Sequence, residues 1–320
     1  MTEEKPRILI VNDDTEDSAH LKTDLQVLDC ITEVASNARE VSEILQWFLP
    51  HLILVDLDWG FGIAKTIRAS NLNGSVPILF LVEANEPQTS LREAEASSWQ
   101  ATETLHKPYH SFELISRCKV LLSLKKYKKE LELAGQVLQS LALAVEARDP
   151  TTGNHCDRLF VRVAAMAELL DLDKRDQDAL RKGAILHDIG KVGVPDSILL
   201  KQGPLTDAEW LIMRQHVVIG ESLCRPLKFL AHVLPIIRHH HERLDGSGYP
   251  DGLKEDQIPL VARVFQVCDV FDALTNFRPY KQPYSIDETL EIMAQETGRG
   301  WWDKGIFKIF ERMIKHETAT

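Results

Sequence analysis

The chain has 320 residues, which at roughly 100 to 200 residues per domain suggests two domains. Hydrophobic residues make up 44% and charged residues 27%, so the composition excludes disordered, collagen-like and disulfide-scaffold chains. No apolar run approaches the roughly 18 residues that cross a bilayer, and the acidic start of the chain is unlike a secretory signal. The five cysteines are scattered and form no CxxC pair, so we expect reduced thiols, a cytoplasmic location and no membrane partner.

The net charge of −11 is concentrated in the first third of the chain. Residues 1–110 carry 8 Lys and Arg against 18 Asp and Glu, whereas residues 111–320 carry 29 against 30. An acidic first domain argues against binding of nucleic acid polymers. Seven of the twelve histidines lie between His155 and His241, and because histidine is the commonest metal ligand this clustering points to a metal site.

Short apolar runs alternate with helical patterns over the first hundred residues. The runs are RILIVND (7–13), HLILVDLD (51–58) and VPILFLVE (76–83). Near-continuous apolar strands separated by helices indicate a parallel sheet that is covered on both faces. We therefore predict a doubly wound α/β domain of the flavodoxin-like type over residues 1–124, with its ligand site at the carboxyl ends of the strands.

A heptad pattern predicts a linker helix over residues 111–148. Two sets of residues repeat every seven positions, the second four residues after the first: Val120, Tyr127, Ala134 and Leu141, then Leu124, Leu131, Leu138 and Val145. Either two chains pair here or the stripe packs on the chain's own domains. The regular register and the length favour a homodimer.

The remaining residues, 140–320, predict an all-α domain that is large enough to bury a core. Helical patterns are broken by Pro and Gly turns, and no convincing alternating strand is present. Examples of the expected helices are 155–170, 173–189, 206–224, 229–242, 258–275 and 285–297.

Three carboxylates and a lysine are predicted to converge at one edge of the first domain's sheet. Asp13 and Asp14 end the first strand, Asp56 ends the third, and Lys107 follows the last. Such a group suits Mg²⁺ beside an aspartate that accepts a phosphoryl group. Residues 5–124 resemble the response-regulator receiver domain. The resemblance implies that Asp56 is phosphorylated by a sensor kinase, that Asp13 and Asp14 hold Mg²⁺, and that Lys107 contacts the phosphoryl group.

Two residues depart from the receiver pattern. Val82 stands where receivers carry a Ser or Thr that hydrogen-bonds the phosphoryl oxygen, and Thr104 replaces the switch aromatic. The domain is then either a phosphorylatable switch or a pseudo-receiver used for dimerisation or docking. We expect that phosphorylation, if it occurs, is weakly coupled to activity.

Imidazoles and carboxylates accumulate in the second domain. His187 and Asp188 end a predicted helix, His155 and His216 lie in the helices on either side, and three consecutive histidines occupy 239–241. Asp269 lies among apolar residues, where a carboxylate is costly unless it is paired or metal-bound. These residues suit a two-metal site for Fe or Mn, with Ni, Co or Zn as alternatives. Because helix neighbours lie about 100° apart, we expect only two of the three consecutive histidines to be ligands.

Glycines and cations near this cluster suggest a phosphate ester as substrate. The segment DGSGYPDG (245–252) predicts a tight loop with Tyr249 at its tip. Lys191, Arg278 and Lys281 would set cationic groups around the metals, which would clamp the attacking and leaving oxygens.

Residues 140–315 resemble the HD-GYP family. The resemblance rests, in chain order, on HDIGK, the later His216, HHERLDGSGYP, the Asp269 helix and NFRPY. The family hydrolyses cyclic di-GMP to pGpG or GMP. The resemblance implies Asp188 as the ligand that bridges two metals, and Lys191, Tyr249, Arg278 and Lys281 as substrate-binding residues. Lys191 would also act in catalysis. Some members hold a third metal through a glutamate where this chain has Thr151, so we expect two. The implied metal ligands are His155, His187, Asp188, His216, His240, His241 and Asp269.

Two alternatives remain open from the sequence. One is a catalytically weak domain that binds cyclic di-GMP and reports it to partner proteins. The other is a phosphodiesterase for another cyclic dinucleotide or for pGpG. Turnover and product analysis on metal-loaded protein would separate these alternatives.

Overall fold

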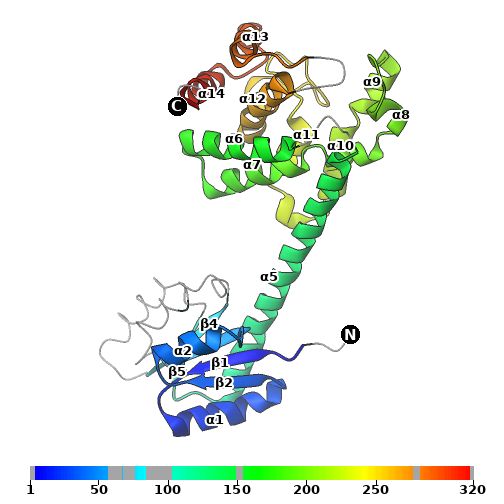
Figure 1. Cartoon of the computed structure of the whole chain (residues 1–320). Helices are drawn as coiled ribbons and strands as arrows, with labels where there is room; N and C mark the ends of the chain where they lie inside the picture. The colour runs from blue at the N-terminus through cyan, green and yellow to red at the C-terminus, as the bar shows by residue number, and fades with distance from the viewer. Residues whose placement is uncertain are drawn as a thin grey trace. The chain divides into compact units, whose positions relative to one another are not determined.

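The computed structural model describes residues 4–56, 67, 76–83, 103–148, 154–276 and 282–317. The chain divides into two compact units, Met1–Ala134 and Gly135–Thr320 (Figure 1). Helix α5 (Ser111–Glu146) is one continuous helix of 36 residues that contributes to both units. The boundary between the units therefore falls within the predicted linker helix. Across the described ranges, no helix combines the length and apolarity needed to cross a membrane.

The first unit contains a five-stranded parallel sheet with the strand order β2-β1-β3-β4-β5. This is the flavodoxin-like order, which confirms the predicted fold class. The two edge strands, β2 and β5, are partly exposed, which explains why no continuous apolar run marks them in the sequence. The strands are β1 (Arg7–Val11), β2 (Ile31–Ala35), β3 (Leu52–Asp56), β4 (Ile78–Glu83) and β5 (Glu103–Lys107).

Both faces of the sheet are covered. On one face, strand residues such as Leu9 and Phe80 pack against Val41 of α2 (Ala38–Leu45). On the other face, the alternate strand residues pack against α1 (Thr15–Leu25) and the start of α5. Because side chains alternate along a strand, the central strands must be apolar at nearly every position. A short 3₁₀ turn, η1 (Gln26–Leu28), follows α1.

The second unit is helical, as predicted, and the described residues outside the first sheet hold only one isolated β-bridge. Its largest core cluster joins α6, α7, α12, α13 and α14. The helices are α6 (His155–Leu169), α7 (Lys174–Leu186), α8 (Asp196–Leu199), α9 (Asp207–Met213), α10 (His216–Cys224), α11 (Leu234–His239), α12 (Leu260–Thr275), α13 (Ile286–Gly298) and α14 (Lys304–Glu317). The 3₁₀ turns are η3 (Ile189–Gly193), η4 (Lys228–Leu230) and η5 (Glu255–Gln257).

Several helices differ from the sequence-based expectation, and α7 ends at Leu186, before the predicted end at 189. The segment 206–224 forms two helices, α9 and α10, so that His216 begins a helix instead of lying inside one. The helix predicted over 229–242 is observed only as α11, Leu234–His239. Pro235 lies in its first turn, where proline is favoured, so the helix begins there and not at 229. Helices α8 and α14 are not among the examples named from the sequence, although the buried residues of α14 at 306, 307, 310, 313 and 314 have helical spacing.

Candidate active site

Seven side chains of metal-ligand type gather in two neighbouring groups in the second unit. In each group, one ligand atom per residue lies within 4.8 Å of the ligand atoms of the others. We call the groups site A and site B. Site A consists of Asp188, His216, His240 and His241, and site B consists of His155, His187 and Asp269. The structure thus brings together all seven residues that the HD-GYP resemblance implies as metal ligands.

Most of these residues lie at helix ends. His155 is the first residue of α6, and His216 is the first residue of α10. His187 directly follows α7, and His240 directly follows α11. Helix α11 ends at His239, so His240 and His241 are not both held to the 100° spacing of helix neighbours. Both side chains reach site A. The third member of the triplet, His239, faces elsewhere.

Asp188 lies between the two sites. Its Oδ1 atom is 3.3 Å from His216 Nε2 and 3.9 Å from His240 Nε2 in site A. Its Oδ2 atom is 3.3 Å from His187 Nε2 in site B. Each carboxylate oxygen therefore faces a different site, which is the arrangement that a bridging ligand of two metals needs.

Four of the histidines have their Nδ1 atoms in contact with an acceptor. His187 Nδ1 lies 3.2 Å from the Gly183 carbonyl oxygen, and His216 Nδ1 lies 2.7 Å from that of Met213. His240 Nδ1 is 3.0 Å from the Ile236 carbonyl oxygen, and His155 Nδ1 contacts a carboxylate. Donation from Nδ1 fixes the tautomer and leaves Nε2 as the ligand atom, which is the usual state of metal-binding histidine.

The donor atoms fit divalent metals. Asp188 Oδ1, His216 Nε2 and His240 Nε2 are buried and have no hydrogen-bond partner among the described residues. Buried polar atoms seldom stay unpaired, so three ligand-type atoms without a partner at one site fit the coordination of a metal ion. Burial lowers the pKa of His240 to about 3 and holds that of His241 well below its ordinary value, so both imidazoles are neutral and can bind a metal. Imidazole with carboxylate is a donor set for transition metals.

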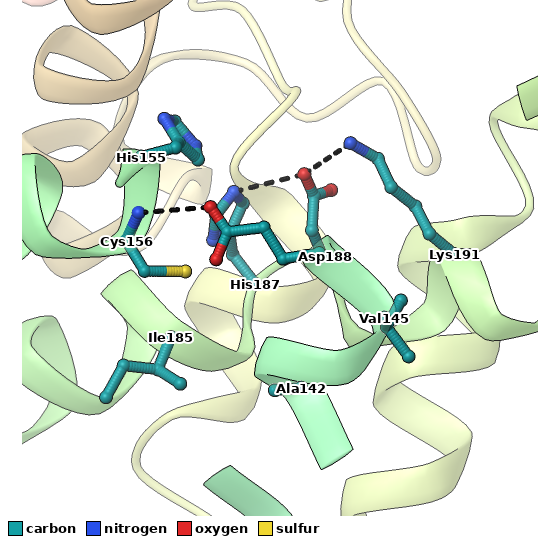
Figure 2. Close-up of a pocket in the computed structure, with 9 residues that line it drawn as sticks. Ala142, Val145, His155, Cys156, Ile185, His187, Asp188 and Lys191 are labelled. Atoms are coloured by element: carbon teal, nitrogen blue, oxygen red, sulfur yellow. Dashed lines mark hydrogen bonds and ion pairs between the residues drawn. The ribbon is translucent and has the colours of Figure 1, made fainter. Parts of the chain in front are cut away.

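Lys191 places an ammonium group beside the bridging carboxylate. Its Nζ atom is 2.6 Å from Asp188 Oδ2 (Figure 2). Burial alone would raise the pKa of Asp188, but Lys191 and His187 outweigh it and hold that pKa well below the ordinary value. The turn η3 that carries Lys191 packs directly on α10, where a Cβ atom at Gly190 would lie 1.9 Å from the His216 carbonyl oxygen. Only glycine allows this approach.

Tyr249 lies folded against site A and not at an exposed loop tip. Its ring stacks on His241 with centroids 4.8 Å apart, and the guanidinium of Arg214 lies 5.1 Å from its ring centre. The Tyr249 backbone N–H donates to the His241 carbonyl oxygen. The preceding residue must be glycine because a Cβ atom at Gly248 would lie 2.4 Å from the Cα atom of Glu242.

A third cluster, His239, Glu242 and Asp251, has ligand-type atoms close together but is already bonded. The Glu242 carboxylate is fully buried and accepts three backbone N–H groups, from residues 251, 252 and 253. Asp251 accepts two hydrogen bonds from Arg238. The cluster therefore acts as a clamp that closes the loop carrying Tyr249, and its carboxylates are engaged. The sequence analysis does not identify Glu242, although it directly follows the histidine triplet.

Asp272 is a second residue that the sequence analysis misses. Its buried carboxylate lies 2.7 Å from His155 Nδ1 and accepts hydrogen bonds from Arg158 and Arg162. Burial would raise the pKa of Asp272, but His155 and Arg158 hold it well below its ordinary value. Asp272 therefore orients His155 from outside site B. Its position three residues after Asp269, on the same face of α12, is the signal that could have identified it.

Comparison with protein families agrees with this arrangement. A family model described as HD domain matches residues 139–306, which is more than half of the chain. The chain belongs to the HD-domain family. Its HDIGK and HHERLDGSGYP motifs, together with the sheet of the first unit, make it an HD-GYP protein with an N-terminal receiver domain.

Three curated relatives of this HD-GYP protein have named activities. It is 34% identical over 262 residues to the cyclic di-GMP phosphodiesterase response regulator RpfG of Xanthomonas campestris pv. campestris, covering 75% of this chain and 68% of the relative. It is 34% identical over 332 aligned residues to a "Probable cyclic di-GMP phosphodiesterase" of Vibrio cholerae, covering 92% and 74%. It is 39% identical over 187 residues to 3'3'-cGAMP-specific phosphodiesterase 2 of Vibrio cholerae, covering 58% and 35%.

The chain is also similar to solved structures. A signal receiver domain of a histidine kinase from Syntrophus aciditrophicus is 28% identical, with a TM-score of 0.34, covering 37% of this chain and 90% of that one.

The HD-GYP protein carries an acidic pocket at the carboxyl edge of its sheet, where the sequence predicts it. Asp13, Asp14, Asp56 and Lys107 all line this pocket. Lys107 Nζ lies 2.6 Å from Asp56 and 2.8 Å from Asp17, and these carboxylates raise the pKa of Lys107 in spite of its burial. Asp14 is the N-cap of α1, and its Oδ1 accepts two backbone N–H groups.

The structure also places the two residues that depart from the receiver pattern. Val82 is buried in the core of the first unit, and Thr104 lies half-buried on β5. Asp17, which pairs with Lys107, is a further acid that the sequence analysis does not single out. Thr151, Arg278 and Lys281, which the sequence analysis names, lie outside the described residues.

Proposed function

We propose that this HD-GYP protein hydrolyses cyclic di-GMP to pGpG and/or GMP. The observation that carries the proposal is the position of Asp188, whose two oxygens face two separate groups of metal-ligand side chains. Two relatives that the chain covers over more than two thirds of their length are named for this substrate. A dinuclear site suits a phosphodiester because it can contact both the attacking and the leaving oxygen.

Each type of side chain at the site has a role in this proposal. Two bound divalent cations, Fe or Mn with Ni, Co or Zn as alternatives, would supply Lewis-acid activation of water and of the phosphate. Asp188 would hold both cations through separate oxygens. Lys191 would neutralise negative charge that develops on the non-bridging phosphoryl oxygens. Tyr249, with Arg278 and Lys281, would bind the substrate around this centre.

The test is product analysis on anaerobically metal-loaded protein. Cyclic di-GMP, 3'3'-cGAMP and pGpG are supplied separately, and products are separated by chromatography. Asp188→Ala serves as the inactive variant, and Asp157→Ala, an exposed carboxylate on α6, serves as the matched control. Turnover of cyclic di-GMP that is lost only in Asp188→Ala supports the proposal. Faster turnover of 3'3'-cGAMP would reassign the substrate, and tight binding without turnover would favour a binding module.

For the first unit we propose a receiver whose Asp56 accepts a phosphoryl group from a sensor kinase, with Mg²⁺ held by Asp13 and Asp14. The ion pair between Lys107 and Asp56 supports this role for both residues. The five free cysteines fit the reducing cytoplasm that we propose as its location.

We also propose a homodimer through α5. The heptad residues in the middle of this helix are exposed in the single chain, with Leu124 at 54%, Tyr127 at 63% and Leu131 at 51%. Leu138 and Val145, at the end of the stripe, pack within the second unit instead. A second copy of α5 would cover the exposed part, as in a parallel coiled coil.

A further inference from the structure

The last turns of α5 form one wall of the pocket beside the metal centre. Ala142, Val145 and Glu146 line it together with His155, His187, Asp188 and Lys191 (Figure 2). All of these residues belong to the second unit. The end of α5 is also anchored by packing, because Ala142 is buried in a cluster with residues of α7, η3 and α11. A displacement of this end of α5 would therefore also displace α7, η3 and α11, which hold residues of the site.

Glu146 connects α5 to the first ligand of site B. Its Oε1 atom accepts the backbone N–H of Cys156 at 3.3 Å. Cys156 is the second residue of α6 and directly follows His155. The first N–H groups of a helix need an acceptor from outside the helix. The N-cap residue Asn154 has φ 62° and makes no side-chain capping bond, so Glu146 supplies an acceptor that the local sequence does not.

Arg148 connects the residues just after α5 to the turn that carries Lys191. Its guanidinium donates to the carbonyl oxygens of Lys191 and Val194, both at 3.2 Å. It also pairs with the Asp196 carboxylate at the start of α8. These three contacts hold the middle of η3 and the residues at its C-terminal end, and η3 fixes the position from which Lys191 reaches Asp188.

We propose that Glu146 and Arg148 are positioning residues that couple the end of α5 to the catalytic centre, Glu146 by placing His155 and Arg148 by placing Lys191. The proposal rests on the proposed function in two respects, which are that the site binds two metals and that Lys191 acts on the substrate. Helix α5 begins at Ser111 in the first unit. A shift of its C-terminal end would therefore act on the metal ligand His155 through Glu146, and on the ammonium group of Lys191 through Arg148.

The decisive measurement is anaerobic titration of the metal-free full-length protein with Mn²⁺, following free Mn²⁺ by electron paramagnetic resonance. Residues that orient a ligand from outside typically change metal affinity by about 10- to 100-fold. We expect Glu146→Ala to weaken one of two binding events about tenfold, and Glu146→Gln, which keeps an acceptor oxygen, to retain most of the affinity. Glu132→Ala, an exposed carboxylate on the same helix, should bind like the wild type.

Arg148 is tested by separating KM from kcat on the loaded protein. Arg148→Ala should leave both metal affinities within about threefold of wild type and lower kcat about tenfold with little change in KM, because Lys191 is proposed to act on charge that develops in the transition state. Arg175→Ala, an exposed arginine on α7, should change neither metal affinity nor kcat. Wild-type metal binding in Glu146→Ala, an equal loss in Glu132→Ala, or an unchanged kcat in Arg148→Ala would overturn the proposal. If the wild type does not hydrolyse cyclic di-GMP, the proposed function fails, but the metal titration still decides the role of Glu146.

Discussion

Replacing Asp272 by asparagine should weaken metal binding at site B without abolishing the fold. The asparagine keeps the size of the side chain and one acceptor oxygen, but it removes the negative charge 2.7 Å from His155 Nδ1. Loss of such a partner costs about 10- to 100-fold in metal affinity, or about 1.4 to 2.7 kcal/mol. Site A, where Nδ1 contacts are made by backbone carbonyl oxygens, should keep its affinity.

Replacing Asp272 by alanine should also destabilise the metal-free protein. Its side chain is 2% exposed and pairs with the guanidinium groups of Arg158 and Arg162. Breaking a buried ion pair by removing one partner costs about 3 to 5 kcal/mol. Because both arginines are partly exposed, with 29% and 19% of their side chains accessible, we expect the lower end of this range.

The two effects are measured separately. Calorimetric titration with Mn²⁺ gives the affinities, and urea unfolding of the chelated protein gives the free energy of unfolding. Asp157→Asn, an exposed carboxylate on α6, is the matched control and should behave like the wild type in both assays. If Asp272→Asn binds two metals with wild-type affinity, His155 does not depend on this carboxylate and the reasoning is refuted.

Three further outcomes are expected. Metal analysis should give two ions per chain, and Asp188→Ala should lose both together with turnover; a stoichiometry near three would contradict a dinuclear site. Changing Leu124 and Leu131 to glutamate should shift a dimer to monomer in sedimentation without loss of stability, since both side chains are exposed in the single chain. Leu138 is left unchanged because it packs against a core cluster of the second unit. A wild type that is already monomeric at micromolar concentration excludes the coiled coil. Beryllofluoride should change phosphodiesterase rate only slightly, because Val82 cannot hydrogen-bond a phosphoryl oxygen; a large change that disappears in Asp56→Asn would restore a conventional switch.

The sequence predicts those parts of the molecule that depend on local pattern. The apolar runs locate the central strands, because a strand covered on both faces must be apolar throughout. The edge strands lack this pattern and are not marked. In the same way, helical spacing gives α6 and α12, but it cannot show that α11 ends at His239 and releases the next two histidines into site A.

Contacts between distant segments are the part of the site that the sequence could not provide. Glu146 and Cys156 are ten residues apart, Arg148 and Lys191 are 43 apart, and His155 and Asp272 are 117 apart. Nothing in the local pattern distinguishes these carboxylates and arginines from solvated surface charges. Tyr249 shows the same limit, because the glycines predict a loop but not that the loop closes over Glu242 and stacks the ring on His241.

The recruitment of ligands from five different helices has a consequence for how the protein responds to a chelator. The ligands come from the ends of α6, α7, α10 and α11 and from the middle of α12, so bound metals would fasten five segments to one point. Binding that occurs only in the folded state adds its free energy to stability. Stripping the metals should therefore lower the melting temperature of the helical unit and leave that of the sheet unit in place, so that one thermal transition separates into two.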